Sequence, residues 1–189
     1  MARRVCTVAL RPHLSVWVPV LQIVLGALVL AVSAQVKIPL PGTPVPATLQ
    51  SIAVLLIGMM LSSYTAIGAS ALYVSFGMAG LPVFAAGSAG LFGPTGGYLV
   101  GFVLTAGVTA WVRGNDRTAM TRLILAGAIG LAVLFLCGVT WLAFWIGSLK
   151  AAIIAGLLPF AAKGVVELLL AASAVRCLSE LQDVRRRNS

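Results

Sequence analysis

Charged side chains are scarce in this sequence, and acidic ones are much scarcer than basic ones. Of 189 residues, 9% are charged, with 13 lysines and arginines against four aspartates and glutamates. Soluble domains contain about 25% charged residues on average, whereas 60% of this chain is hydrophobic. The composition therefore excludes an ordinary soluble domain and indicates an integral membrane protein.

The side chains on which most enzymes depend are equally rare. His13 is the only histidine and precedes the first apolar run, so a nucleophile within the membrane lacks its base. Cys6, Cys137 and Cys177 show no CxxC or metal-ligand spacing. No Gly-Lys-Ser or Gly-Lys-Thr completes a nucleotide-binding P-loop. We expect no enzymatic activity, no cofactor, no metal site and no ATP hydrolysis through a P-loop.

Six apolar runs are long enough, or nearly so, to cross a membrane as helices. They predict one membrane domain over residues 1–189, an all-α polytopic protein with six transmembrane helices at about 16–36, 48–61, 65–81, 95–112, 123–146 and 160–178. The second run is short for a hydrocarbon core of about 30 Å, so we expect it to be partly sunk beneath the segment before it. A signal peptide is the alternative for residues 1–34, although the first run exceeds the roughly 7–15 residues usual for such a segment.

The chain beyond the fifth run is harder to assign. Residues 151–158 are apolar and fit either a loop or a first helical turn, and Pro159 marks the expected start of the last span. The tail after residue 178 is polar, and we expect it to be frayed.

Basic residues gather on one side of these spans. The positive-inside rule therefore predicts a multi-pass protein of the cytoplasmic membrane, with both termini, the turn at 62–64 and the loop at 113–122 in the cytoplasm. Topology, and not nucleic-acid binding, then explains the net charge of +9. Three irregular segments, 37–50, 82–94 and 147–159, face outward together. This arrangement predicts an outward-facing substrate pocket.

Proline shapes the segment between the first two spans. Pro39, Pro41, Pro44 and Pro46 rule out a helix there and require extended backbone. Unpaired backbone groups cannot face hydrocarbon, so the segment lies in water at the membrane surface or folds over a protein-lined cavity. We interpret it as a cap over a pocket.

Three loop motifs, in this order, carry a resemblance to a known family. They are Ile38-Pro39-Leu40-Pro41-Gly42-Thr43-Pro44-Val45-Pro46 with Thr48-Leu49-Gln50, then Gly80-Leu81-Pro82-Val83-Phe84, then Gly93-Pro94-Thr95-Gly96-Gly97-Tyr98. Over about residues 15–180 the chain resembles the BioY family, the biotin-specific S-components of energy-coupling-factor (ECF) transporters.

The resemblance implies uptake of biotin across the cytoplasmic membrane by a substrate-binding subunit. Its expected partners are biotin, the lipid bilayer, a transmembrane coupling protein and the ATP-binding subunits of an ECF module. The alternatives are a solitary biotin facilitator and a non-catalytic membrane subunit that binds another small carboxylate. A membrane enzyme, a reading from another class, would need convergent acid and base groups that this chain does not offer.

Lys163 and Glu167 are the most informative ionisable residues. Glu167 is the only acidic residue inside an expected span, and the two side chains, one turn apart, can pair. Family members have an Asp and, three residues later, a Lys after a Pro-Phe such as Pro159-Phe160, which also suggests Phe160 as a site residue. Here those two positions hold Gly164 and Glu167. We expect Lys163 to meet the biotin carboxylate and Glu167 to hold Lys163 or accept a ureido N–H; a simple surface salt bridge is the alternative.

Two further motifs suggest ligand contacts. The amide of Gln50 can donate to and accept from a ureido group, although a polar residue at a helix start would look the same. Thr95, Gly96, Gly97 and Tyr98 open a helix whose free N–H groups and dipole suit a carboxylate. The alternative for the glycines is a tight turn and close helix packing.

Ala27 and Ala31 form a small-xxx-small pair in the first span, a spacing that lets two helices approach closely. It is similar to the AxxxA surface by which S-components of this class dock on the coupling protein. Internal packing is the alternative.

Overall fold

The computed structural model describes residues 12–38, 40, 42–85, 90–116 and 118–187. Within these residues the chain forms seven α-helices: α1 (Pro12–Gln35), α2 (Gln50–Met60), α3 (Ser63–Met78), α4 (Gly96–Arg113), α5 (Met120–Ile146), α6 (Leu149–Gly156) and α7 (Leu158–Arg187). A small antiparallel hairpin pairs β1 (Lys37–Ile38) with β2 (Ala47–Thr48), and a 3-10 turn, η1, covers Gly90–Phe92. The predicted all-α fold is confirmed.

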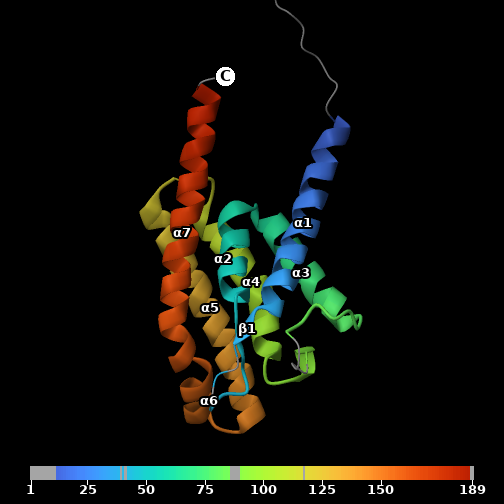
Figure 1. Cartoon of the computed structure of the whole chain (residues 1–189), viewed down its shortest axis with the longest axis vertical. Helices are drawn as coiled ribbons and strands as arrows, with labels where there is room; N and C mark the ends of the chain where they lie inside the picture. Colours follow the sequence, from blue (N-terminus) through green and yellow to red (C-terminus); the bar gives the residue numbers. More distant parts are fainter. Residues whose placement is uncertain (1–11, 39, 41, 86–89, 117, 188–189) are drawn as a thin grey trace, which may run out of the picture.

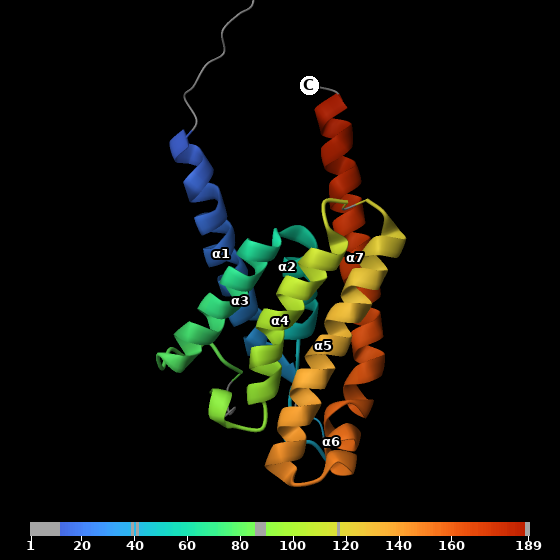
Figure 2. The same ribbon diagram turned by 180° about the vertical axis from the view of Figure 1, so that it is seen from behind.

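The helices pack side by side as a bundle with two distinct ends. Helix α1 begins and α7 ends at one end, which we call the terminal end, and the α4–α5 connection also lies there (Figure 1). The β1–β2 hairpin, η1 and α6 lie toward the opposite end, which we call the hairpin end (Figure 1). Seen from behind, α1 and α7 extend beyond the other helices at the terminal end (Figure 2). The irregular segments therefore gather at one end of the bundle.

The helices bury narrow stripes and expose large apolar side chains. In α7, Leu168, Ala171 and Ala172 are buried, whereas Val166 and Leu170 are 57% exposed. An apolar exterior of this kind suits a hydrocarbon environment. Three described segments, in α1, α5 and α7, are long and apolar enough to cross a membrane.

Helix α2 lies inside the bundle. It has 11 residues, a length of about 16 Å, and it buries Val54, Leu55 and Met59 completely. It begins two residues after the end of β2. The end of the hairpin and the first turn of α2 therefore place the polar side chains of Thr48, Gln50 and Ser51 inside the bundle.

The last two helices differ from the sequence expectation. Residues 151–158, for which loop and helical turn were both open, belong largely to α6, and the Ser148 side chain caps this helix by accepting from the Ala151 N–H. Helix α7 begins at Leu158 and continues to Arg187, so the tail expected to fray is helical. An Arg176–Glu180 ion pair of 2.8 Å, one turn apart, supports this extension.

The α4–α5 connection at the terminal end is held by Asp116. Its Oδ1 accepts from the Thr118 N–H at 2.9 Å, from the Thr118 hydroxyl at 2.9 Å and from the Ala119 N–H at 3.1 Å. These hydrogen bonds, the backbone N–H of Thr118 first, lower the pKa of the Asp116 carboxyl below its usual value.

Candidate functional site

A cavity lies between the hairpin, the start of α2 and helices α4, α5 and α7. The volume open to the centres of water molecules is about 70 Å³, and since about 10–15 Å³ of such volume holds one water, the cavity has room for several. Phe84, Phe102, Phe135 and Phe160 line its apolar walls. The hairpin covers part of it through Val45, Pro46 and Thr48, in agreement with the interpretation of the proline segment as a cap.

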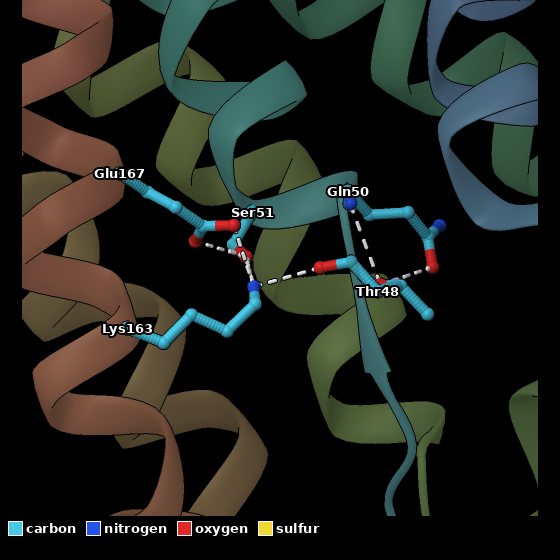
Figure 3. A network of polar contacts seen from close by, with 5 residues as sticks. All are labelled: Thr48, Gln50, Ser51, Lys163 and Glu167. Carbon is cyan, nitrogen blue, oxygen red and sulfur yellow. Dashed lines mark hydrogen bonds and ion pairs between the residues drawn. The ribbon is translucent and has the colours of Figure 1, made fainter. Parts of the chain in front are cut away.

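One wall of the cavity carries a network of polar contacts centred on Lys163 (Figure 3). The Lys163 ammonium group lies 2.5 Å from Glu167 Oε1, and it donates to Ser51 Oγ at 2.9 Å and to the Thr48 carbonyl at 2.7 Å. The Ser51 hydroxyl donates to Glu167 Oε2 at 2.6 Å. Lys163, Ser51 and Glu167 thus form a closed ring of hydrogen bonds, which we call the polar ring.

The hydrogen-bond count of the polar ring determines what it offers a ligand. An ammonium group has three donors, and all three of Lys163 have acceptors within the chain. A carboxylate has about four acceptor positions, of which Glu167 uses two. The polar ring therefore has no donor left for a ligand, but the Glu167 carboxylate can still accept hydrogen bonds from one.

Burial makes this network energetically significant. The Glu167 side chain is 7% exposed and that of Lys163 is 29% exposed. A charge removed from water to this extent is tolerated when it is paired and hydrogen-bonded. The pairing expected from the one-turn spacing is present, and it lies in a cavity wall, not on the outer surface.

Gln50 lines the cavity beside this network and is held from two sides. Its Nε2 donates to the Tyr73 hydroxyl at 2.7 Å, and its Oε1 accepts from the Thr48 hydroxyl at 3.1 Å. Tyr73, on α3, is 1% exposed, and its ring meets Phe84 edge-on at 5.5 Å. The orientation of the Gln50 amide is therefore fixed by a residue outside the cavity.

Thr95 and Tyr98 reach the cavity from the start of α4. The Thr95 hydroxyl is buried and has no hydrogen-bond partner among the described residues, which leaves a polar atom available to a ligand. The Tyr98 hydroxyl donates to the Gly156 carbonyl at 2.7 Å, so Tyr98 presents its ring to the cavity and connects α4 to the end of α6.

Gly96 and Gly97 are absent from the cavity wall. A Cβ at Gly96 would collide with the Leu91 carbonyl, and one at Gly97 would collide with the Trp141 side chain. The Trp141 indole N–H donates to the Gly93 carbonyl at 2.9 Å. These glycines let the turn before α4 pack closely against α5, as in the packing alternative; a direct role in carboxylate binding stays a prediction.

Three residues of the site, Thr48, Ser51 and Tyr73, were not predicted from the sequence. A serine directly after Gln50, at the start of an apolar run, was an available signal for Ser51. A tyrosine within an apolar run needs a partner for its hydroxyl, which was a signal for Tyr73. The aromatic walls at Phe102 and Phe135 had no such signal, because phenylalanine in an apolar helix is equally suited to a lipid-facing position.

Ala27 and Ala31 do not form an exposed pair in this structure. Ala27 is 3% exposed, and Ala31 is half-buried and packs against the core. Internal packing accounts for Ala27 in the isolated chain. A docking role for the pair stays a prediction.

Comparisons with known proteins agree on one family. The model of the BioY family matches residues 10–183. The chain is 36% identical over 156 residues to the biotin transporter BioY of Thermotoga maritima, covering 81% of this chain and 90% of that protein. It is 33% identical over 126 residues to the biotin transporter BioY2 of Lactococcus lactis, covering 65% and 68%. A crystal structure of the S-component for biotin from an ECF-type ABC transporter shares the fold, with a TM-score of 0.77 at 21% identity, covering 91% of this chain and 95% of that one.

Proposed function

The chain belongs to the BioY family, and from this membership we propose that it takes up biotin as the substrate-binding subunit of an ECF-type transporter. It is a membrane protein. The observation that carries the proposal is the capped cavity, with aromatic walls and one polar ring, found in a member of a biotin-transporter family. The relatives are named as transporters, in agreement with the expectation that the chain is not an enzyme.

Biotin fits the chemistry of this cavity. It is a small amphiphile with a fused ring system that carries a ureido group, and an apolar chain that ends in a carboxylate. Small-molecule sites typically have apolar and aromatic walls with a few well-placed polar groups. Phe102, Phe135 and Phe160 supply such walls, and Glu167 and Gln50 supply the polar groups.

The hydrogen-bond count favours one orientation of biotin. Because Lys163 has no unused donor and Glu167 has unused acceptor positions, the polar ring suits the ureido N–H groups. A carboxylate in the same position would lie beside the Glu167 carboxylate and be repelled. In this proposal Glu167 accepts a ureido N–H and Lys163 holds Glu167 in place, which replaces the expectation that Lys163 meets the biotin carboxylate.

The biotin carboxylate then points toward the start of α4. The unpartnered Thr95 hydroxyl supports this assignment because it can donate to a carboxylate oxygen. Gly96 and Gly97 contribute indirectly, by letting Trp141 hold the turn that carries Thr95. Tyr98 and Phe160 contribute ring surface.

The proposed topology has six spans within one domain, formed by α1 to α5 and α7, with both termini in the cytoplasm and the cavity facing outward. Arg113, Arg122, Arg176 and Arg185 lie on the ends of α4, α5 and α7 that point to the terminal end, which supports a cytoplasmic terminal end by the positive-inside rule.

A transmembrane coupling protein and ATP-binding subunits are the proposed partners, since no P-loop motif in this sequence would let the chain hydrolyse ATP itself. A solitary facilitator would use the same cavity, and biotin uptake by cells with and without an ECF module distinguishes the two.

The first test is calorimetry of the purified chain with biotin. We expect saturable binding with one biotin per chain, and substantially weaker binding of an analogue in which both ureido nitrogens are methylated, because that analogue cannot donate to Glu167. Well-folded protein that shows no saturable biotin binding would contradict the proposed function.

A further inference from the structure

Ser51 does more in this structure than contribute to the start of a helix. It lies in the first turn of α2, lines the cavity and directly contacts two side chains of α7. Its hydroxyl accepts from the Lys163 ammonium group at 2.9 Å and donates to Glu167 Oε2 at 2.6 Å (Figure 3). One small side chain therefore contacts both charged members of the polar ring.

Each of these two hydrogen bonds satisfies a different group, one a donor of Lys163 and the other an acceptor of Glu167. Without the hydroxyl, the third ammonium proton of Lys163 would lack its acceptor and Glu167 Oε2 would lack its donor. An unsatisfied ammonium proton attracts anions, whereas a carboxylate held by one oxygen only is free to rotate about its last torsion, which is broad. The hydroxyl thus affects both the charge preference of the cavity wall and the direction of the Glu167 lone pairs.

We propose that Ser51 is a positioning residue that determines ligand specificity: its hydroxyl orients the Glu167 carboxylate to accept a ligand N–H and occupies the Lys163 proton that would otherwise receive an anion. This inference rests on the proposed function, because it names the residue that makes the same cavity selective for a neutral N–H donor. Ser51 acts through Glu167 and Lys163, and no direct bond from Ser51 to the ligand is required.

The test compares two ligands on the unmodified chain and on Ser51→Ala. Competition against labelled biotin gives the ratio of the affinities for biotin and for biotin methylated on both ureido nitrogens. Loss of the hydroxyl should weaken biotin by about tenfold, because a hydrogen bond to a charged group contributes on this scale. It should weaken the methylated analogue much less, so the affinity ratio should fall by roughly the same factor.

Three further variants separate positioning from packing. Ser51→Thr keeps the hydroxyl and should restore the ratio, whereas Ser51→Cys, with a weak donor of similar size, should behave like Ser51→Ala. Ser75→Ala is the matched control, since among the described residues the Ser75 hydroxyl bonds only to the Ala71 carbonyl of its own helix, and it should leave both affinities unchanged. Equal loss of both ligands in Ser51→Ala, or no change in either, would overturn the proposal.

A second measurement needs no ligand. Acylation by an amine-reactive reagent, followed by mass spectrometry, reports how accessible the Lys163 amine is, with the exposed Lys150 on α6 as internal reference. Lys163 should react more slowly than Lys150 in the unmodified chain and several-fold faster in Ser51→Ala than in the unmodified chain. If the unmodified chain fails to bind biotin, the proposed function is wrong. The reactivity of Lys163 still tests the role of Ser51 in that case, because an unchanged acylation rate in Ser51→Ala would overturn the proposal that Ser51 occupies a proton of Lys163.

Discussion

At the scale of the residue, single hydrogen bonds determine which ligand groups the wall of this cavity can bind. The ion pair between Lys163 and Glu167 was foreseeable from their spacing, because residues four apart share a helix face. It was not foreseeable that all three donors of the Lys163 ammonium group would find acceptors within the chain. The acceptors that saturate Lys163, at Thr48 and Ser51, come from a distant part of the chain, and only the packing of α2 against α7 brings them together.

The two charged residues should depend on one another. Glu167→Gln leaves the half-buried Lys163 charge without its partner, and Lys163→Met leaves the buried Glu167 charge without its partner. Breaking a buried pair costs about 3–5 kcal/mol, and a smaller effect is expected for Glu167→Gln because Lys163 is 29% exposed. The double variant removes both charges and should recover much of the lost thermal stability but not biotin binding. Unfolding in detergent and calorimetry measure the two effects.

The orientation of biotin adds a sharper criterion for the same variants. Glu167→Gln should weaken biotin and biotin amide to a similar extent, because both ligands carry the ureido group. If Glu167→Gln or Lys163→Met affected only the ligand that bears a carboxylate, the sequence-based expectation for Lys163 would be correct and the orientation proposed here would be wrong.

Tyr73 offers a test of how Gln50 is oriented. Tyr73→Phe removes the hydroxyl that accepts from Gln50 Nε2 at 2.7 Å and keeps the ring packed against Phe84. We expect biotin affinity to fall by a few-fold to tenfold, since a single hydrogen bond contributes about 0.5–1.5 kcal/mol. In a Gln50→Leu background the same substitution should have little further effect, and additive losses would show that Tyr73 does not act through Gln50.

At the scale of the element, local chemistry was the best guide. Proline fixes φ and removes a donor, so the absence of a helix from the described residues between α1 and α2 was predictable from the four prolines of this segment, of which Pro39 and Pro41 lie outside the described residues. The helical start at Thr95 followed from a glycine-rich motif before an apolar run. The function of its glycines did not follow, because whether Gly97 faces a ligand or Trp141 depends on the rotation of α4 against α5.

Short and terminal elements were predicted less well. Helix α6 lies in a stretch whose hydropathy fits loop and helix equally, and the decisive signal was the capping serine, Ser148, before it. The extension of α7 through Arg187 is supported by the Arg176–Glu180 ion pair, and the polar composition of the tail alone does not predict this pair.

The α4–α5 connection should show a pH dependence of its own. The pKa of Asp116 is lowered in the folded protein, so its bonds to Thr118 and Ala119 contribute stability that is present above the unfolded carboxyl pKa of about 3.9 and is lost as the pH falls through the lower folded pKa. The Tm of Asp116→Ala should therefore lie below that of the unmodified chain at pH 7, and the difference should shrink in acid. Asp116→Asn, which keeps an acceptor oxygen, should show a smaller difference with less pH dependence.

At the scale of the whole molecule, composition determined the class of protein and charge distribution suggested its orientation. An apolar exterior and three helices of spanning length agree with the sequence-based prediction of a membrane protein. The shorter helices α2 and α3 are the ones for which length alone is ambiguous, because α2 with 11 residues and α3 with 16 are too short to settle a span.

The proposed topology is tested by single cysteines in a chain from which Cys6, Cys137 and Cys177 have been removed. A cysteine at Gly42 in the hairpin or at Gly147 before α6 should react with a membrane-impermeant thiol reagent in intact cells, whereas one at Asn115 in the α4–α5 connection should react only after the membrane is opened. The reverse pattern would place the cavity on the cytoplasmic side.

The closed polar ring has a consequence for energy conversion. Lys163 and Glu167 neutralise each other, so the ring provides no countercharge for the carboxylate of biotin, and the loaded cavity carries the ligand's negative charge. Inward movement of one such charge against an inside-negative membrane potential costs about 2.3 kcal/mol per 100 mV. A carrier that relied on the biotin gradient alone would be opposed by the voltage of the cell, and at 100 mV net uptake would require an outside concentration about 50-fold above the inside one. ATP hydrolysis in the proposed partner subunits would remove this requirement.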